Sequence, residues 1–157
     1  MKQELQDKLV KKYPKIFKMV GSTPQQSCMA FGLCVGDGWY WLIDQLCHVL
    51  QHNTDQNNQS QVVAAQVKEK FGGLRFYINS GSDEQFAAIS LAEAMSYSIC
   101  EECGTTKDVS QSKTGWITTL CSSCREKREK SNCQHEWGTD GQHSNKYCKK
   151  CYISKDE

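Results

Sequence analysis

The sequence of 157 residues contains no long hydrophobic run. None of its apolar stretches approaches the roughly 20 residues that a membrane-spanning helix needs, which argues against an integral membrane protein. The N-terminal stretch MKQELQDKLVKKYPKIF is charged from its second residue and lacks the apolar segment of a secretory signal. We therefore expect a protein of the cytoplasm. Its hydrophobic share of 38% and charged share of 24% are typical of a globular domain.

Charge of one sign is also scarce, because the formal net charge is only +1. The distribution is uneven: residues 105 to 155 carry ten Lys and Arg against five Asp and Glu, whereas residues 1 to 104 carry nine against eleven. A mildly basic C-terminal third suits contact with phosphates or with an acidic protein face. It falls well short of the basic stripe of a dedicated nucleic-acid-binding protein.

Signatures of catalysis are missing as well. The sequence has no phosphate-binding loop, since Gly36-Asp37-Gly38 is an isolated turn, and no Gly-x-Ser-x-Gly nucleophile motif. Cys47 and His48 are adjacent, so on a helix they point to different faces and cannot act directly as a dyad. The sequence thus predicts a protein that is not an enzyme.

Cysteine, by contrast, is abundant, with ten residues in the chain. Six of them form three Cys-x-x-Cys pairs, a spacing too short for an easy structural disulfide within each pair. Because no export signal is visible, bound zinc in a reducing cell is favoured over a disulfide framework.

The first predicted zinc site has four cysteine ligands: Cys100, Cys103, Cys121 and Cys124. Two Cys-x-x-Cys pairs separated by seventeen residues place two thiolates on each of two opposite edges of a tetrahedron. Gly104, directly after the first pair, helps the chain to turn back. Four protein ligands leave no open position for water, so this metal would maintain shape rather than perform chemistry.

A second zinc site is predicted in the segment CQHEWGTDGQHSNKYCKKC. Its three thiolates would come from Cys133, Cys148 and Cys151 and its imidazole from His135, with His143 as the alternative in the same loop. This site would also be fully ligated. We therefore expect two structural zinc ions per chain.

Three cysteines and a neighbouring histidine belong to neither predicted site: Cys28, Cys34, Cys47 and His48. A third metal site from this set is one alternative. Their spacings are irregular, Cys47 falls near the apolar face of a predicted helix, and cysteine is commonly buried as a small hydrophobic residue. Core cysteines are therefore favoured over a third site.

Periodicity predicts three helices: residues 3–13, 37–52 and 83–99. Asp37 is the expected N-cap of the second helix, and Ser82 with Gln85 fits a capping box for the third. Turn-forming or polar composition predicts a loop or short strand over residues 20–36 and a loop over residues 53–60.

Residues 62–80, VVAAQVKEKFGGLRFYINS, indicate a β-hairpin around Gly72-Gly73. After the turn, apolar residues alternate with polar or amphipathic ones, so three of them should face the core: Leu74, Phe76 and Ile78. A helix over residues 62–70 competes with the first strand, because its alanine, lysine and glutamate residues favour helix.

Together these elements predict an α+β fold with a small helix and hairpin core, a four-cysteine zinc-knuckle unit and a small zinc ribbon with three Cys and one His. The expected boundaries are 1–99 for the core, 100–130 for the knuckle unit and 131–157 for the ribbon. In this arrangement zinc replaces a hydrophobic core that the short C-terminal segments cannot build.

The pattern CxxCG…TG…LCxxC resembles the zinc framework of HNH-type endonucleases such as the recombination endonuclease VII family. Those enzymes carry an Asp-His pair between the two knuckles, where it binds a catalytic metal and activates water. In this sequence the corresponding span, residues 105–119, contains Asp108 but no histidine. The resemblance therefore implies a related scaffold of about 25 residues used without nuclease chemistry, with a degenerate nuclease as the least favoured reading.

A longer stretch, GDGWYWLIDQLC…QVKEKFGGLRFYINSG…CEECG…GWITTLCSSC, resembles a widespread set of uncharacterised small proteins from bacteria and their phages. The tail CQHEW…YCKKC resembles small CxHxW…YCxxC zinc ribbons of phage proteins. These resemblances imply a phage or mobile-element origin. They also suggest an inhibitor or adaptor that acts on a host protein inside a bacterial cell, for example on a defence system.

Two functions of different classes follow from these patterns. The favoured hypothesis is a non-enzymatic binding module whose partner is a host protein, and the alternative is a nucleic-acid-binding zinc protein that uses the basic C-terminal third. The candidate contact residues are aromatic or basic: Arg75, Tyr77, Trp116, Arg125, Lys127, Arg128, Lys146, Lys149 and Lys150. The alternating charges of residues 125–130 equally fit a solvated helix.

Overall fold

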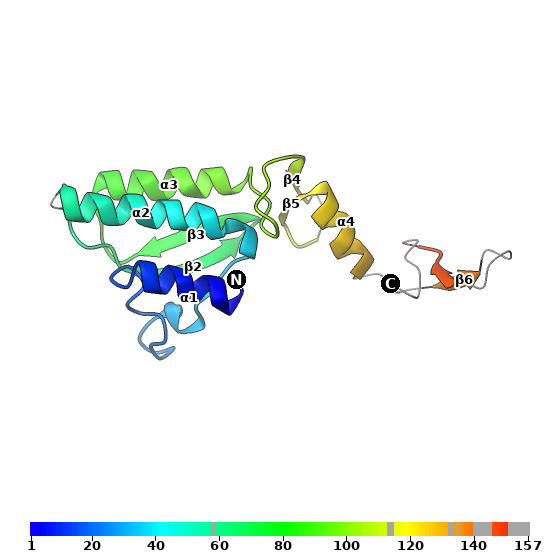
Figure 1. Cartoon of the computed structure of the whole chain (residues 1–157), viewed down its shortest axis with the longest axis horizontal. Coiled ribbons are helices and arrows are strands. Elements are labelled where there is room, and N and C mark those ends of the chain that lie inside the picture. Colours follow the sequence, from blue (N-terminus) through cyan, green and yellow to red (C-terminus); the bar gives the residue numbers. More distant parts are fainter. Residues whose placement is uncertain (58, 113–114, 132–133, 135, 140–145, 151–157) are drawn as a thin grey trace. The chain divides into compact units, whose positions relative to one another are not determined.

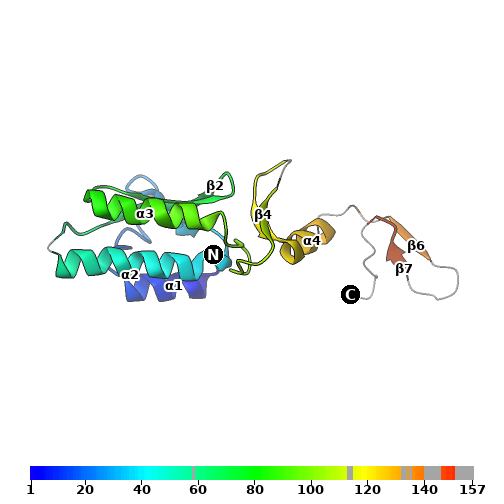
Figure 2. The same cartoon turned by 90° about the horizontal axis from the view of Figure 1, so that it is seen from above.

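The fold combines helices with small sheets, as predicted, and includes a cluster of four cysteines (Figures 1 and 2). The computed structural model describes residues 1–57, 59–112, 115–131, 134, 136–139 and 146–150. By its internal packing the chain divides into two units, residues 1–121 and residues 122–157. Within the described ranges, no helix has both the length and the apolar character needed to cross a membrane.

Helix α1, Gln3–Lys12, confirms the first predicted helix. Its apolar side reaches the core through Leu9, which is fully buried, and the chain turns at Tyr13 so that Ile16 and Phe17 are buried behind it. The Tyr13 hydroxyl donates to the backbone carbonyl of Asp44, which lies in helix α2, Tyr40–Gln56, at a distance of 3.0 Å. These contacts explain why α1 lies against that helix rather than in solvent.

Residues 20–36 form a compact connection with two short elements, the 3-10 helix η1, Cys28–Phe31, and strand β1, Leu33–Cys34. The side chain of Ser27 caps η1 by accepting the backbone N–H of Met29 at 3.1 Å. The short strand was one of the two alternatives predicted for this segment. It brings the chain back to the edge of the sheet.

Helix α2, Tyr40–Gln56, follows the 3-10 helix η2, Asp37–Trp39. The prediction that Asp37 caps this helix is wrong, because its carboxylate accepts the backbone N–H of Lys2 at 2.7 Å. The polar loop predicted from residue 53 begins later, since the helix continues through four polar residues to Gln56. Extending an existing helix costs less free energy than starting one, so α2 continues through these residues despite their polar composition.

The hairpin prediction is confirmed, and the competing helix over residues 62–70 is wrong. Strand β2, Ala64–Lys70, pairs antiparallel with β3, Gly73–Ile78, and β1 pairs parallel with β2, in the order β1-β2-β3. Lys70 lies opposite Gly73, so the central turn residues are Phe71 and Gly72 rather than the two glycines. The apolar alternation holds, with three inward residues buried or partly buried: Leu74, Phe76 and Ile78.

Helix α3, Asp83–Ser96, begins at the predicted capping box of Ser82 and Gln85, in which both reciprocal hydrogen bonds form. It lies beside α2, and it covers the outer edge of β3 (Figures 1 and 2). The backbone N–H of Leu74 donates to Ser96 Oγ and that of Phe76 to Glu93 Oε1, both at 2.9 Å. Side chains of α3 thus satisfy an edge strand that would otherwise be open to pairing.

Two further antiparallel pairs complete the described structure. Strands β4, Val109–Gln111, and β5, Thr119–Cys121, end the first unit. Helix α4, Ser122–Ser131, opens the second unit, which also contains strands β6, Trp137–Thr139, and β7, Lys146–Cys148. Helix α4 buries no residue, as the prediction of a solvated charged helix implies.

Candidate metal centre

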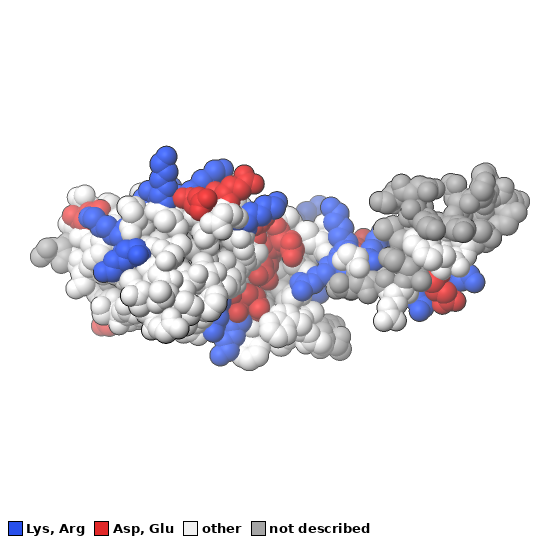
Figure 3. Space-filling model, turned by 90° about the horizontal axis from the view of Figure 1, so that it is seen from below, with Lys and Arg blue, Asp and Glu red and all other residues white. Residues whose placement is uncertain are grey.

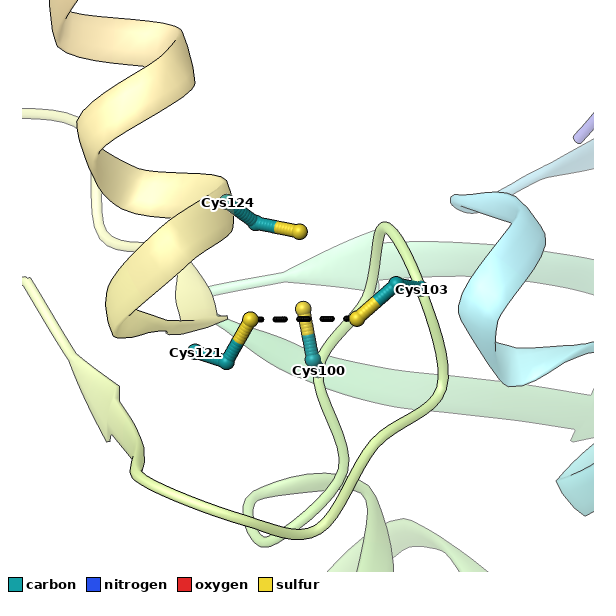
Figure 4. A group of neighbouring side chains, drawn as sticks. All are labelled: Cys100, Cys103, Cys121 and Cys124. Atoms are coloured by element: carbon teal, nitrogen blue, oxygen red, sulfur yellow. Dashed lines mark hydrogen bonds between the residues drawn. The ribbon is translucent and has the colours of Figure 1, made fainter.

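Four cysteine side chains converge on one point: Cys100, Cys103, Cys121 and Cys124. Their sulfur atoms all lie within 4.8 Å of one another, and Figure 4 shows the four side chains pointing toward a common centre. Among the residues that the structure describes, this is the one group with ligand atoms arranged to hold a metal ion. The sequence pattern therefore identified a real spatial cluster.

The sulfur spacing fits a tetrahedral metal site. Sulfur ligands at about 2.3 Å from zinc are separated from one another by roughly 3.8 Å in a regular tetrahedron. Cys103 Sγ and Cys121 Sγ lie 3.7 Å apart. A disulfide bond would require about 2.05 Å between the two atoms, so this pair is not covalently linked. The four cysteines can hold one metal ion.

The first knuckle, residues 100–104, is held in shape by its own backbone. The Cys100 N–H donates to the Thr105 carbonyl, and the Gly104 N–H donates to the Cys100 carbonyl, both at 2.8 Å. Gly104 adopts φ +77°, a left-handed conformation that a residue with a side chain rarely takes. The glycine after the first pair therefore has the role that the sequence predicted for it.

The first knuckle rests on the Gly36–Gly38 turn. The Gly38 N–H donates to the Glu101 carbonyl at 2.7 Å, and the Gly36 N–H donates to Glu101 Oε1 at 3.0 Å. A Cβ atom on Gly38 would lie 2.2 Å from the Cys100 carbonyl oxygen. Sequence reasoning treated this turn as isolated and missed its role; two glycines spaced by one residue were the available signal for a close backbone approach.

The second pair of ligands comes from the end of β5 and the start of α4. Cys121 is the last residue of β5 and Cys124 lies in the first turn of α4. The Glu101 N–H donates to the Thr119 carbonyl at 3.0 Å, which connects the first knuckle directly to β5. Cys100 and Cys121 are buried, whereas Cys103 is exposed and Cys124 is half-buried.

This donor set suits a closed structural site. Four thiolates complete the tetrahedral coordination that zinc takes in proteins, so no ligand position is left for a reacting water. Thiolates also favour zinc over the hard cations Mg²⁺ and Ca²⁺, which take oxygen ligands. A zinc ion held there would cross-link the chain and would take no part in redox chemistry, because zinc is not redox-active.

The second predicted site falls largely outside the described residues, because Cys133, His135, His143 and Cys151 are not described. Cys148 is described and fully buried at the end of β7. The backbone N–H of Lys150 is directed at Cys148 Sγ, 3.4 Å away, a contact that suits a thiolate acceptor. The zinc ribbon itself stays a prediction.

The remaining cysteines do not form a third cluster with His48 among the described residues. Cys47 is fully buried in α2, which confirms the core interpretation for that residue, and burial raises the pKa of its thiol well above the usual range. The same interpretation is wrong for Cys28 and Cys34, which are exposed. In the 20–36 segment the buried positions are taken by their neighbours Met29, Leu33 and Val35 instead.

Asp108, the acidic residue of the nuclease-like span, is exposed and precedes β4 with φ +54°. Backbone conformation gives this residue a structural role, since aspartate tolerates the left-handed region better than most residues do. Residues 105–119 contain no histidine that could join it.

The predicted contact residues divide into two groups. Arg75 is held against α3, with its guanidinium 2.9 Å from the Tyr97 hydroxyl and 3.7 Å from the Glu93 carboxylate; the hydrogen bond to Tyr97 raises the pKa of Arg75. Tyr77 and Trp116 are exposed. In the second unit, four of the predicted basic side chains are exposed: Lys127, Arg128, Lys149 and Lys150. Arg125 is half-buried, and the side chain of Lys146 is not described.

Sequence reasoning missed three neighbours of Trp116. Lys68, Lys70 and Phe71 line a groove together with Trp116 and Ile117. Phe71 adopts φ +54°, a conformation that costs a residue with a side chain about 1 kcal/mol or more. The signal available in the sequence was a phenylalanine directly before Gly72, where a two-residue hairpin turn prefers asparagine or aspartate.

Comparison with known proteins gives no match: no family model, no curated protein and no solved structure is significantly similar to this chain.

Proposed function

We propose that this chain is a zinc-stabilised, non-enzymatic binding module whose partner is a protein. The observation that carries the proposal is the cluster of four cysteine sulfurs within 4.8 Å of one another, which gives a metal a full set of protein ligands. Zinc is the ion that this donor set suits best. A second zinc ion is held by Cys133, His135, Cys148 and Cys151, so each chain carries two.

The exposed apolar side chains of the first unit support a protein as the partner. Large apolar side chains on the first unit are more than a third exposed, including Trp116 at 75% and Phe71 at 64%. Exposed aromatic residues close together mark interaction sites on globular proteins. The resemblance to small phage and bacterial proteins adds the expectation of a host protein as the partner, for example a defence protein in the bacterial cytoplasm.

Nucleic acid is the competing partner, and charge argues against it. Figure 3 shows basic and acidic side chains both present on one face, without a continuous basic stripe. The net charge of the whole chain is +1, whereas nucleic-acid-binding domains are usually strongly basic. Helix α4, SSCREKREKS, concentrates four basic residues against two acidic ones and is the element most suited to phosphate contacts.

Two measurements test the proposal. Elemental analysis of the purified chain should give two zinc ions per chain, and fewer than one would contradict a zinc-stabilised module. Binding to single- and double-stranded nucleic acid across a salt series should be weak throughout. Tight binding that falls steeply as salt rises would instead assign the chain to nucleic acid.

The protein partner is tested by affinity capture from a bacterial lysate, with the metal-free chain as the control. The proposal expects a reproducible partner that the zinc-loaded chain retains and the metal-free chain loses. If neither form retains a protein reproducibly, a binding function for this chain is wrong.

A further inference from the structure

A groove of about 410 Å³ lies beside the tip of the β2–β3 hairpin. It is lined by Lys68, Glu69, Lys70, Phe71, Gly115, Trp116 and Ile117, all within the first unit. Three of these side chains are large, apolar and exposed: Phe71 at 64%, Trp116 at 75% and Ile117 at 38%. Apolar side chains gathered at one hollow on the surface suggest an anchor point for a partner.

Phe71 is displayed at a conformational cost. The two central turn residues, Phe71 and Gly72, have φ +54° and φ +73°, which is the pattern of a type I′ turn. Glycine takes such angles freely, but phenylalanine does not, and Phe71 gains little from burial in return. Strain at an exposed aromatic residue points to a role outside folding.

The zinc-bearing segment fixes the geometry of this turn. Gln111 Nε2 donates to the Phe71 carbonyl at 3.1 Å, and the Thr119 hydroxyl donates to the Gly72 carbonyl. A Cβ atom on Gly72 would lie 2.7 Å from Gln111 Nε2, so the two hairpins touch closely. Because β5 also supplies Cys121, the metal centre and the groove share one strand.

The charges at the rim of the groove indicate the charge of the partner that it would bind. Lys68 Nζ lies 5.8 Å from the centre of the Tyr77 ring and Lys70 Nζ lies 5.3 Å from that of Phe71, and neither ammonium group pairs with an acid among the described residues. The Glu69 carboxylate accepts the Gly72 N–H at 2.6 Å and is therefore hydrogen-bonded within the turn. Two lysines beside an apolar hollow are complementary to carboxylates flanking a large apolar side chain.

We propose that this groove binds a segment of a partner protein in which a large apolar side chain is flanked by Asp or Glu. The inference rests on the proposed function, a protein-binding module, and adds the binding surface and the chemistry of the segment. The apolar anchor packs between Phe71 and Trp116, and the flanking carboxylates pair with Lys68 and Lys70. A single-stranded nucleic acid, which also uses aromatic and basic groups, is the alternative that the test must separate.

The test starts with a random peptide library screened against the zinc-loaded full chain, followed by affinity measurements on individual enriched peptides. We expect enriched peptides to carry an aromatic or large aliphatic residue flanked by acidic residues. Phe71→Asn and Trp116→Ser should each weaken their binding at least about tenfold. Lys70→Glu should weaken it and should also reduce its dependence on salt.

Matched variants keep this result interpretable. Asparagine suits the first position of a type I′ turn, so Phe71→Asn should unfold at the same or a higher temperature than the parent chain. Trp41→Ser removes another exposed tryptophan, 60% exposed on α2 and outside the groove, and should leave binding unchanged. A thymidine homopolymer should not compete with the bound peptide.

Three results would overturn the inference. Enriched peptides that bind Phe71→Asn and Trp116→Ser as tightly as the parent chain would exclude the groove. If binding falls with Trp41→Ser instead, the chain is still a protein-binding module but its surface lies elsewhere. Competition by the thymidine homopolymer at the same residues would replace the acidic segment by nucleic acid and would contradict the proposed function as well.

Discussion

Asp37 connects the N-terminus to the turn on which the first knuckle rests. Its carboxylate accepts the backbone N–H of Lys2 at 2.7 Å and lies 3.3 Å from the ammonium group of the same residue. The backbone hydrogen bond lowers the pKa of Asp37 below its ordinary value of 3.8. A carboxylate expected to cap a helix therefore stabilises a contact between distant segments.

Replacing Asp37 should destabilise the protein in a pH-dependent manner. A folded-state pKa below the unfolded value stabilises the fold above pH 3.8, and this contribution is lost as the pH falls through the lower folded value. Asp37→Ala should reduce the free energy of unfolding by about 1 kcal/mol at neutral pH. Urea unfolding of both proteins should show the difference shrinking below about pH 4, and a difference independent of pH would contradict the assignment.

The cysteines should divide by reactivity according to burial and metal binding. In the zinc-loaded chain a maleimide should label Cys28 and Cys34, which are exposed. Cys47 should resist labelling, because it is fully buried and burial raises the pKa of its thiol. Addition of a chelator should add the metal ligands Cys103 and Cys124, which are exposed and half-buried, to the labelled set. Peptide mass mapping reads out each site, and labelling of Cys47 before Cys28 would show that the core differs from the one described.

At the scale of elements, the hairpin and the capping box were predictable because their signals are local. A capping box uses residues three apart, and alternation over β3 reports a single buried face. The first knuckle was predictable for the same reason, because ligand spacing along the chain reflects tetrahedral geometry. The bounds of α2 were predicted less well, since polar residues 53–56 continue a helix already nucleated by its apolar turns.

Contacts between distant elements were beyond the reach of the sequence. The docking of the Gly36–Gly38 turn on Glu101 joins residues more than sixty positions apart. The groove depends in the same way on Gln111 and Thr119 reaching the Phe71-Gly72 turn. Local patterns indicate turns at these positions, but only the folded arrangement shows which residues approach them.

The Gly36–Gly38 turn should be sensitive to a single methyl group. A Cβ atom on Gly38 would lie 2.2 Å from the Cys100 carbonyl oxygen and 2.4 Å from the Gly104 nitrogen, both backbone atoms that cannot rotate away. Gly38→Ala should therefore displace the knuckle and weaken zinc retention at least about tenfold, measured by competition with a chromophoric chelator.

Gly81→Ala is the matched control for this substitution. Its Cβ would meet the end of the Ile78 side chain at 2.8 Å, a flexible group that can move aside. Zinc retention in the control should stay close to that of the parent chain. Equal retention in Gly38→Ala and Gly81→Ala would show that the knuckle does not depend on this docking contact.

At the scale of the whole molecule, we expect a bound metal and the hydrophobic core to stabilise different parts of the chain. The core of the first unit contains buried side chains from α1, α2, α3 and the three-stranded sheet. Residues 100–121 have few such side chains, and zinc binding in small zinc domains contributes on the order of 10–16 kcal/mol at neutral pH. The metal should therefore control the knuckle and the groove more than the helices.

Removal of zinc should have a local effect. Hydrogen exchange of the metal-free chain should accelerate over residues 100–121 and at the Phe71-Gly72 turn, because that turn is fastened by Gln111 and Thr119. Exchange in α2 and α3 should change little, and zinc should restore the original protection. Unchanged exchange at the turn would show that the structure of the groove does not depend on the metal. Loss of protection throughout the chain would show that the core also depends on zinc.

The most direct test of the metal centre is X-ray absorption at the zinc edge on the purified full-length chain. Four-cysteine coordination at Cys100, Cys103, Cys121 and Cys124 predicts a first shell dominated by sulfur at about 2.3 Å, with a minor nitrogen contribution from the second zinc. A first shell dominated by oxygen or nitrogen near 2.0–2.2 Å would contradict a closed thiolate site that serves only to hold the fold.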